Sequence, residues 1–186
     1  NNSIITEYKK QELPNYEVFD EKRYFERGNS PAIFEVNGFR VGLSVCEDIW
    51  HQKVITQLHE KEADLVLNIN ASPFHLNKIQ ERKNLISGHA SKFSMPIVYA
   101  NQVGGQDELV FDGTSMAMDS TGKQVLQLAK FETDQAVVSF LSQHDGNILS
   151  DKNKVIPEDS ELEEVYKALV LGAKDYICLL YTSPSP

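Results

Sequence analysis

The middle of the chain alternates between two hydrophobic periods. Residues 34–45, FEVNGFRVGLSV, favour two strands joined at Asn37-Gly38, a dipeptide that readily adopts the positive backbone angles of a tight hairpin turn. Apolar residues then recur at helical spacing over residues 49–63, and the apolar run that follows ends at residues 72–73, Ser-Pro. The predicted order is therefore strand, helix, strand.

The same alternation continues toward the C-terminus. Residues 77–94 are predicted to form a second helix, and residues 95–105 a strand that ends in glycines. Residues 111–129 favour a hairpin that turns at residues 120–122, Ser-Thr-Gly, and residues 135–141 favour a further strand. The alternation predicts an α/β layered fold in which neighbouring strands are parallel and helices cover a face.

The pattern changes after residue 141. Residues 142–159 are polar and contain glycine and proline, which is the composition of a linker. Residues 160–177 favour an amphipathic helix that begins with a capping box, Ser160 with Glu163. Residues 178–186, CLLYTSPSP, resemble translated sequencing-adapter read-through, so we expect them not to be native sequence. The apolar stripe of the helix, which nothing else in the sequence is expected to cover, comprises Leu162, Val165, Tyr166, Leu169 and Ala173.

Composition narrows the classes of function. The 186 residues suit one medium domain, and 18 Lys and Arg against 27 Asp and Glu give a formal charge of −9. This charge disfavours binding to nucleic acid or to an anionic membrane surface, so small molecules or proteins are the expected partners. No apolar run approaches the ~18–20 residues that span a bilayer. Two cysteines are too few for a disulfide framework, which favours a reducing, cytoplasmic location.

The candidate chemistry is centred on Cys46, in the stretch VGLSVCEDIW. A cysteine in an apolar run usually packs as a small hydrophobic residue. Cys46, however, follows a predicted strand and precedes a predicted helix, where a sharp turn exposes a nucleophile over the edge of a sheet. Glu47 and Asp48 would raise the pKa of the thiol if they faced it. A reactive Cys46 therefore needs a cation or a proton acceptor nearby.

Two motifs resemble those of the nitrilase-like amidohydrolases, and most closely those of the glutaminase domain of the glutamine-dependent NAD synthetases. The first is K-x-x-L-P-x-Y at residues 10–16, followed by F-D-E at residues 19–21. The second is G-L-x-x-C-E-D-x-W at residues 42–50. The resemblance extends to about residue 177, and the two motifs together are much more specific than either alone. It implies a partial nitrilase-like α-β-β-α sandwich, followed by a linker and one helix of a synthetase domain.

The resemblance implies a role for six residues. Cys46 matches the nucleophile and Lys10 the lysine that favours the thiolate and stabilises the oxyanion. The pocket for glutamine is expected to include Tyr16, Glu47, Ser72 and Lys78. Lys78 replaces an arginine of the relatives, which keeps the charge but loses a bidentate contact with a carboxylate. No metal site is predicted, because the histidines lack the spacing of zinc ligands.

The resemblance also implies a division of the chain and a set of partners. Residues 1–141 are expected to be the later half of a carbon-nitrogen hydrolase (glutaminase) domain, residues 142–159 the linker, and residues 160–177 the first helix of the ATP-dependent domain. Glutamine would be the amide donor; ATP, Mg²⁺ and deamido-NAD would bind the domain that lies outside this chain, in a homo-oligomeric parent. The general-base glutamate is expected upstream of Lys10, where Glu7 lies too close to serve. We therefore expect a fragment with negligible glutaminase activity by itself.

Less specific interpretations stay open at this point. Lys10 lies in a charged stretch and could be a solvated surface residue, and Tyr16 could be an ordinary half-buried aromatic residue. Ser72 could simply end a strand. Two other functions are possible: a stand-alone amidase or nitrilase with another substrate, and a non-enzymatic α/β module with Cys46 packed in its core.

Overall fold

The hairpin predicted at Asn37-Gly38 forms one edge of the central sheet. The structure, a computed structural model, describes residues 3–142, 148–150, 154–157 and 159–180. Strands β1 (Ala32–Val36) and β2 (Phe39–Val45) are antiparallel, and the turn residues have φ angles of 50° and 80°. These are the left-handed angles that Asn and Gly adopt most readily, so the dipeptide determines the position of the turn. An extended segment that contains a short helix, α1 (Glu21–Tyr24), precedes the hairpin.

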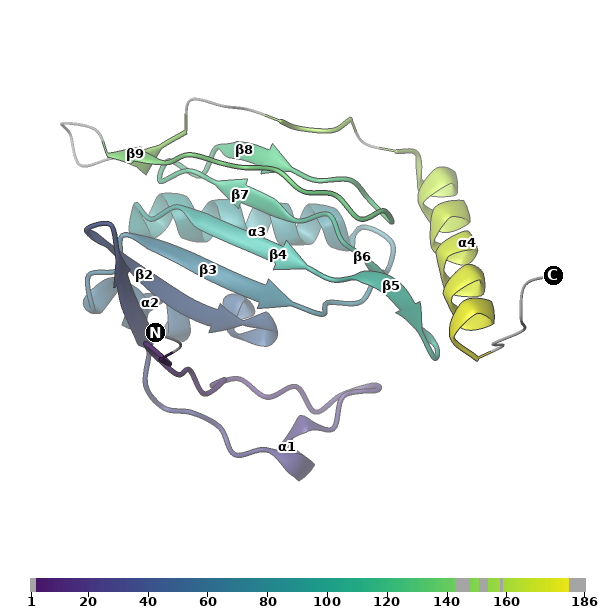
Figure 1. The fold of residues 1–186 in the computed structure, drawn as a ribbon, viewed down its shortest axis with the longest axis horizontal. Helices are drawn as coiled ribbons and strands as arrows, with labels where there is room; N and C mark the ends of the chain where they lie inside the picture. Colours follow the sequence, from purple (N-terminus) through teal and green to yellow (C-terminus); the bar gives the residue numbers. More distant parts are fainter. Residues whose placement is uncertain (1–2, 143–147, 151–153, 158, 181–186) are drawn as a thin grey trace.

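The central sheet has six strands in the order β1-β2-β3-β4-β7-β8. Strands β2, β3 (Leu65–Asn70) and β4 (Ile97–Asn101) are parallel, whereas β7 (Met116–Met118) and β8 (Gln124–Gln127) are antiparallel to their neighbours. The connections between the parallel strands contain α2 (Gln52–Glu60) and α3 (Lys78–Phe93), and both helices lie on the same face of the sheet (Figure 1). The main hydrophobic core fills the space between, and its members include Ile55, Leu58, Val66, Ile86, Ile97 and Met116.

A second, smaller unit extends from the end of β4. Strands β5 (Val103–Gln106) and β6 (Leu109–Asp112) form a separate hairpin, and α4 (Glu161–Leu180) packs against it (Figure 1). The strand predicted over residues 95–105 is therefore two strands, because the chain leaves the central sheet after β4 and pairs with β6. Two short strands, β9 (Leu141–Ser142) and β10 (Ile148–Leu149), pair with each other.

One expectation for the C-terminal third is wrong. Residues 135–140 do not form a strand: Val138 and Phe140 pack on Ala117, Val125 and Leu126, but their backbone joins no ladder within the described residues. Their alternation therefore reflects packing on a sheet face rather than strand pairing. The apolar stripe of α4, for which no covering partner was expected, is exposed at Leu162 (80%), Tyr166 (67%) and Leu169 (67%), whereas small residues such as Ala168 and Gly172 face inward.

The remaining C-terminal expectations concern the ends of α4, the linker and the tail. The capping box is confirmed, because the Glu163 carboxylate accepts hydrogen bonds from the N–H and Oγ of Ser160 at 2.9 and 2.8 Å. The helix continues to Leu180, three residues beyond the predicted end at residue 177. Of the predicted linker, residues 143–147, 151–153 and 158 lie outside the described residues, as do residues 181–186 of the tail.

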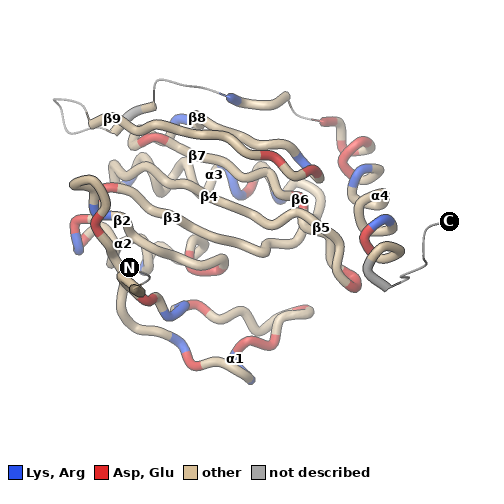
Figure 2. The backbone as a smooth tube through the Cα atoms, in the orientation of Figure 1, with Lys and Arg blue, Asp and Glu red and all other residues tan. Residues whose placement is uncertain are grey.

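The charged residues are unevenly distributed over the described chain. Figure 2 shows them concentrated on the N-terminal segment and α4, with few on the central strands. Within the described ranges, no helix combines the length and the apolar character needed to cross a membrane.

Candidate active site

Cys46 lies at a sharp turn where β2 ends. A short 3-10 helix, η1 (Cys46–Trp50), begins at this residue, and Cys46 itself has a φ of 48°. A non-glycine residue in this left-handed region is strained by about 1–3 kcal/mol, and such strain is concentrated at functional sites. The thiol is half-buried and forms no disulfide. It thus lies at the carboxyl edge of the parallel strands, where α/β sheets bind ligands.

Asp48 anchors the N-terminal segment. Its buried carboxylate accepts hydrogen bonds from the N–H groups of Gln11 and Glu12 at 3.1 and 2.8 Å, and from the Tyr8 hydroxyl at 2.8 Å. It also accepts the N–H of Val45 at 2.9 Å. The residues on both sides of Lys10 are thereby fixed beside the turn that carries Cys46.

Lys10 is paired with a glutamate beside the thiol. Its Nζ donates to both carboxylate oxygens of Glu21, each at 2.7 Å, and its side chain is 16% exposed. This excludes the interpretation of Lys10 as a freely solvated lysine. Glu21 belongs to the F-D-E segment at residues 19–21. Because this segment is close to Lys10 in the sequence, it could have indicated Glu21 as the partner of Lys10.

The ionisation of Cys46 reflects opposing influences. Burial raises the pKa of the Cys46 thiol above its ordinary value, while the charge of Lys10 and the backbone N–H of Ala71 lower it. The carboxylates of Glu47 and Glu21 add smaller contributions that raise the pKa. Burial dominates, so the free thiol is the resting form and the reaction needs a proton acceptor.

A cavity of about 270 Å³ opens beside the thiol. Its walls come from the N-terminal segment, from η1 and from the connection between β3 and α3. This volume is slightly below the ~300–1,000 Å³ typical of pockets for drug-sized ligands, so it suits a smaller molecule. The residues that line it are Pro14, Tyr16, Glu17, Phe19, Cys46, Glu47, Trp50, Ser72, Pro73, His75 and Lys78. Five of the six predicted site residues are therefore brought together here, and Lys10 lies beside the thiol without lining the cavity.

Tyr16 and Glu47 form one side of this cavity. The Tyr16 hydroxyl donates to Oε2 of Glu47 at 2.8 Å. Burial and this carboxylate raise the pKa of Tyr16, so the phenol stays protonated and remains a donor. Glu47 thus turns a carboxylate toward the cavity, where it can accept a hydrogen bond from a bound ammonium group.

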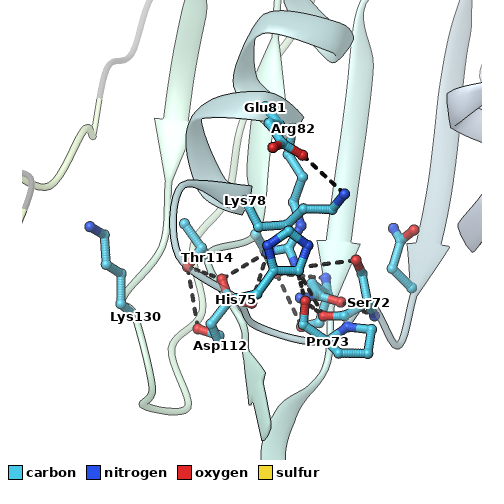
Figure 3. Close-up of polar contacts among 12 residues, drawn as sticks. Ser72, Pro73, His75, Lys78, Glu81, Arg82, Asp112, Thr114 and Lys130 are labelled. Carbon is cyan, nitrogen blue, oxygen red and sulfur yellow. Dashed lines mark hydrogen bonds and ion pairs between the residues drawn. The ribbon is translucent and has the colours of Figure 1, made fainter. Parts of the chain in front are cut away.

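Ser72 and Lys78 also line this cavity. Ser72 follows β3, and its N–H donates to Oδ1 of Asn101 at 2.9 Å. Lys78 begins α3, with its Nζ 3.1 Å from a carboxylate oxygen of Glu81 (Figure 3) and 4.0 Å from the centre of the Trp50 ring. The lining of the cavity therefore includes both a carboxylate, that of Glu47, and an ammonium group, that of Lys78. This arrangement complements the two charged ends of an α-amino acid.

Sequence reasoning missed three residues of this site. Glu21 pairs with Lys10, Asp48 anchors its segment, and Trp50 supports Lys78. Asp48 and Trp50 stand in the motif at residues 42–50, but local sequence gives no indication of which way a side chain points. Within the described part of the chain, no group of three or more His, Cys, Asp or Glu residues could hold a metal ion.

Comparison with known proteins places the chain in a family. Residues 1–143 match the carbon-nitrogen hydrolase family, which covers most of the chain. The chain belongs to the carbon-nitrogen hydrolase family. Its fold is accordingly nitrilase-like, and the described part comprises the sheet and the helix layer of one side of the predicted sandwich.

Curated relatives show which members of this family the chain is similar to. The chain is 38% identical to a glutamine-dependent NAD(+) synthetase of Aquifex aeolicus over 94% of its own length, and 36% identical to one of Acinetobacter baylyi over 94%. It covers 36% and 32% of those proteins, so this carbon-nitrogen hydrolase chain spans about a third of the relatives it matches. The division at residues 141, 159 and 177 stays a prediction.

Solved structures show the same resemblance to the synthetases and to nitrilase-superfamily amidases. The glutamine-dependent NAD+ synthetase of Acinetobacter baumannii, solved with ADP, matches with a TM-score of 0.85 and 39% identity, over 91% of this chain and 32% of that one. An amidase of the nitrilase superfamily from Nesterenkonia matches with a TM-score of 0.59 and 26% identity, over 66% of this chain and 45% of that one. In a structure of a mutant of that amidase, the acetamide moiety of fluoroacetamide is added covalently at the active-site cysteine.

Proposed function

We propose that this chain supplies the glutamine-hydrolysing site of a glutamine-dependent NAD(+) synthetase. The observation that carries the proposal is the position of Cys46, at a strained turn beside the Lys10–Glu21 pair and a small cavity whose lining includes both a carboxylate and an ammonium group. Glu47 and Lys78 would bind the α-ammonium and α-carboxylate groups of glutamine. This leaves the side-chain amide free to reach the thiol.

The proposed reaction proceeds through a thioester. A proton acceptor removes the thiol proton, and the Cys46 sulfur attacks the amide carbon of glutamine to form a tetrahedral oxyanion. The carbon–nitrogen bond then breaks, the nitrogen takes up the proton, and ammonia leaves a glutamyl thioester. Water attacks the thioester carbon, which releases glutamate and restores the thiol. In the parent enzyme, the ammonia would amidate deamido-NAD that has been adenylated by ATP, with Mg²⁺.

Lys10 and Glu21 have separate roles in this scheme. The Lys10 ammonium group stabilises negative charge on the sulfur and on the oxyanion. Both oxygens of Glu21 already accept hydrogen bonds from Lys10, so we assign Glu21 to holding the ammonium group rather than to accepting the thiol proton. Ser72 and Tyr16 would add hydrogen bonds that orient the substrate.

A covalent probe tests the proposal without requiring turnover. In the probe, a chloromethyl ketone replaces the side-chain amide of glutamine, so the thiolate displaces chloride and a carbon–sulfur bond forms. We expect labelling of Cys46 that saturates with probe concentration, located by peptide mass spectrometry. Cys178, which is exposed on α4, is an internal control and should react without saturation. Non-saturating labelling of both cysteines would overturn the proposal.

The same experiment addresses a second candidate, a stand-alone amidase. The likeness to the Nesterenkonia amidase favours that candidate, and fluoroacetamide is the matching probe. A glutamine-specific site should react with the glutamine analogue far faster than with fluoroacetamide, because the amino and carboxylate groups contribute binding energy that only the analogue can use. The opposite order would favour an amidase for small amides.

A further inference from the structure

Arg82 is a fully buried arginine that contacts the loop bearing Ser72. It lies on α3, and its Nη2 donates to the carbonyl and Oγ of Ser72 at 3.0 and 3.1 Å and to the carbonyl of Pro73 at 2.9 Å (Figure 3). Three acceptors on two consecutive loop residues are thus held by one guanidinium nitrogen. Both of those residues line the cavity beside Cys46.

The other side of the guanidinium group is fixed by Asp112. Nη1 of Arg82 lies 2.8 Å from each carboxylate oxygen of Asp112, at the end of β6, and neither side chain is exposed. The Thr114 hydroxyl donates to the same carboxylate at 2.8 Å. The carboxylate therefore determines the orientation of the planar guanidinium group, which in turn determines the position of the loop.

The net stability of the fold does not account for this pair. Desolvation of two charges commonly offsets their attraction, and replacing a buried ion pair by apolar residues is often neutral. Nε of Arg82 is also buried without an acceptor in the described part of the chain. What the pair specifies is geometry. The loop is held on one side by Arg82 and on the other by Asn101, which accepts the N–H of Ser72 at 2.9 Å.

The loop also contacts the nucleophile. The backbone N–H of Ala71, next to Ser72, lowers the pKa of Cys46, so it lies close enough to stabilise the thiolate. A displacement of the loop would therefore move two groups at once: the Ser72 hydroxyl in the cavity and the N–H beside the sulfur. Arg82 itself does not line the cavity, so its effect on a substrate must act through these groups.

We propose that Arg82, oriented by Asp112, is a positioning residue that sets Ser72 and the Ala71 N–H against Cys46 for binding of the amide substrate. This inference rests on the proposed function, because it assigns Arg82 to the same glutamine site. It distinguishes two kinds of residue around the cavity. Lys78 and Glu47 are able to contact the substrate, whereas Arg82 determines where another contact residue lies.

The test compares two reagents at the same thiol in the full 186-residue chain. One is the chloromethyl ketone analogue of glutamine, and the other is iodoacetamide, which alkylates thiolates without needing the cavity. Both rates depend on the thiolate fraction, so the ratio of their second-order rate constants at Cys46 reports recognition alone. The variants are Arg82→Lys, which keeps the charge, and the double variant Arg82→Met with Asp112→Leu, which leaves neither charge unpaired.

The matched control is Arg40→Lys. Arg40 is a half-exposed arginine on β2 whose guanidinium group contacts a carboxylate, Glu62, at 3.0 Å and a carbonyl, that of Lys61, at 2.7 Å. It has the same two kinds of partner as Arg82 but lies outside the cavity lining. The control therefore separates the loss of an arginine from the loss of this particular loop contact.

We expect the rate ratio to fall by about tenfold to a hundredfold in both Arg82 variants, because a displacement near 1 Å has effects of this size, and to stay unchanged in Arg40→Lys. The iodoacetamide rate at Cys46 should not rise. An unchanged ratio would overturn the inference. So would faster iodoacetamide alkylation of Cys46 in both variants, because that result indicates general loosening of the core. Unsaturable labelling of the unmodified chain would instead overturn the proposed function.

Discussion

Two lysine–glutamate pairs in this protein have almost the same geometry but different surroundings. Lys10 lies 2.7 Å from Glu21, and Lys130 lies 2.6 Å from Glu164, all four side chains being at most one quarter exposed. The first pair lies beside Cys46 and changes the pKa of its thiol. The second joins α4 to the segment that follows β8. The distance within an ion pair therefore does not indicate its role, and the neighbouring groups do.

The helix α4, which carries Glu164, meets the β5–β6 hairpin in a packing interface. A Cβ on Gly105 would lie 2.9 Å from the Cα of Gly172, so the hairpin and α4 approach more closely than larger residues would allow. The Asp175 carboxylate accepts the N–H of Gly105 at 2.8 Å. No thiol lies among these contacts, and Lys130 is 7% exposed. We therefore expect the two pairs to respond to mutation in different assays.

The largest effect is expected for Lys10→Met. Without the ammonium group, the thiolate and the developing oxyanion lose their nearest positive charge, and labelling of Cys46 by the glutamine analogue should slow by about a hundredfold. Lys130→Met should leave this rate unchanged within about twofold, because Lys130 does not line the cavity and its ammonium group pairs with Glu164 on α4. Equal effects of the two variants, measured by mass spectrometry, would remove the distinction between the pairs.

A smaller effect is expected for Asp48→Ala. The variant leaves the buried N–H groups of Gln11 and Glu12 without their acceptor, at about 1–3 kcal/mol for each unsatisfied group. The segment bearing Lys10 should then move, with analogue labelling slowed by about tenfold and faster hydrogen exchange at residues 8–12. Asp64→Ala is the control, since Asp64 accepts the Arg40 N–H at 2.6 Å, away from this segment. Unchanged exchange at residues 8–12 would contradict the anchoring role of Asp48.

The α4 interface should respond to Gly105→Ala. The added methyl group would meet the Gly172 backbone, and overpacking of this kind costs about 1–3 kcal/mol. Hydrogen exchange over residues 161–180 should become faster, while labelling of Cys46 stays the same. Gly88→Ala on α3 is the matched control, because a Cβ there meets no atom within 4 Å. Slower labelling of Cys46 in Gly105→Ala would show that the two regions are coupled.

The smallest effect of a variant is expected on the pH profile of Cys46 alkylation. A raised pKa means less thiolate at a given pH, so iodoacetamide alkylation should increase by about tenfold per unit from pH 7 to pH 9 without a plateau. Lys10→Met removes a charge that opposes this shift, so its profile should move to higher pH. Lys130→Met should leave the profile in place. A plateau below pH 8 in the unmodified chain would contradict the dominance of burial.

Local sequence patterns predicted much of the fold. The Asn37-Gly38 turn, the parallel strands β2 to β4 and the helices between them each follow from short-range periodicity or turn chemistry. The strand expected over residues 135–141 failed because ladder pairing depends on a distant partner, which periodicity does not specify. The contact face of α4 was missed because close approach requires small residues, so Gly172 faces the hairpin and the larger apolar residues do not.

The site likewise contains residues that could be predicted from the sequence and residues that could not. The family resemblance assigned Cys46, Tyr16, Glu47, Ser72 and Lys78 to the site, and the structure brings all five to one cavity. The residues that hold this arrangement, Arg82 with Asp112 and Glu21 with Lys10, are joined by contacts between elements. Such contacts depend on how the elements pack, and a separation of 30 positions in the sequence gives no local signal that the side chains of Arg82 and Asp112 meet.

Protection by substrate tests the central claim most directly. The chain is incubated with the chloromethyl ketone analogue in the presence of increasing L-glutamine, and labelling is followed at Cys46 and at Cys178 in the same sample. We predict that L-glutamine slows labelling of Cys46 in a saturable manner, that D-glutamine and L-asparagine protect far less, and that Cys178 is unaffected. Labelling of Cys46 that L-glutamine does not slow would contradict the assignment of this cavity as a glutamine site.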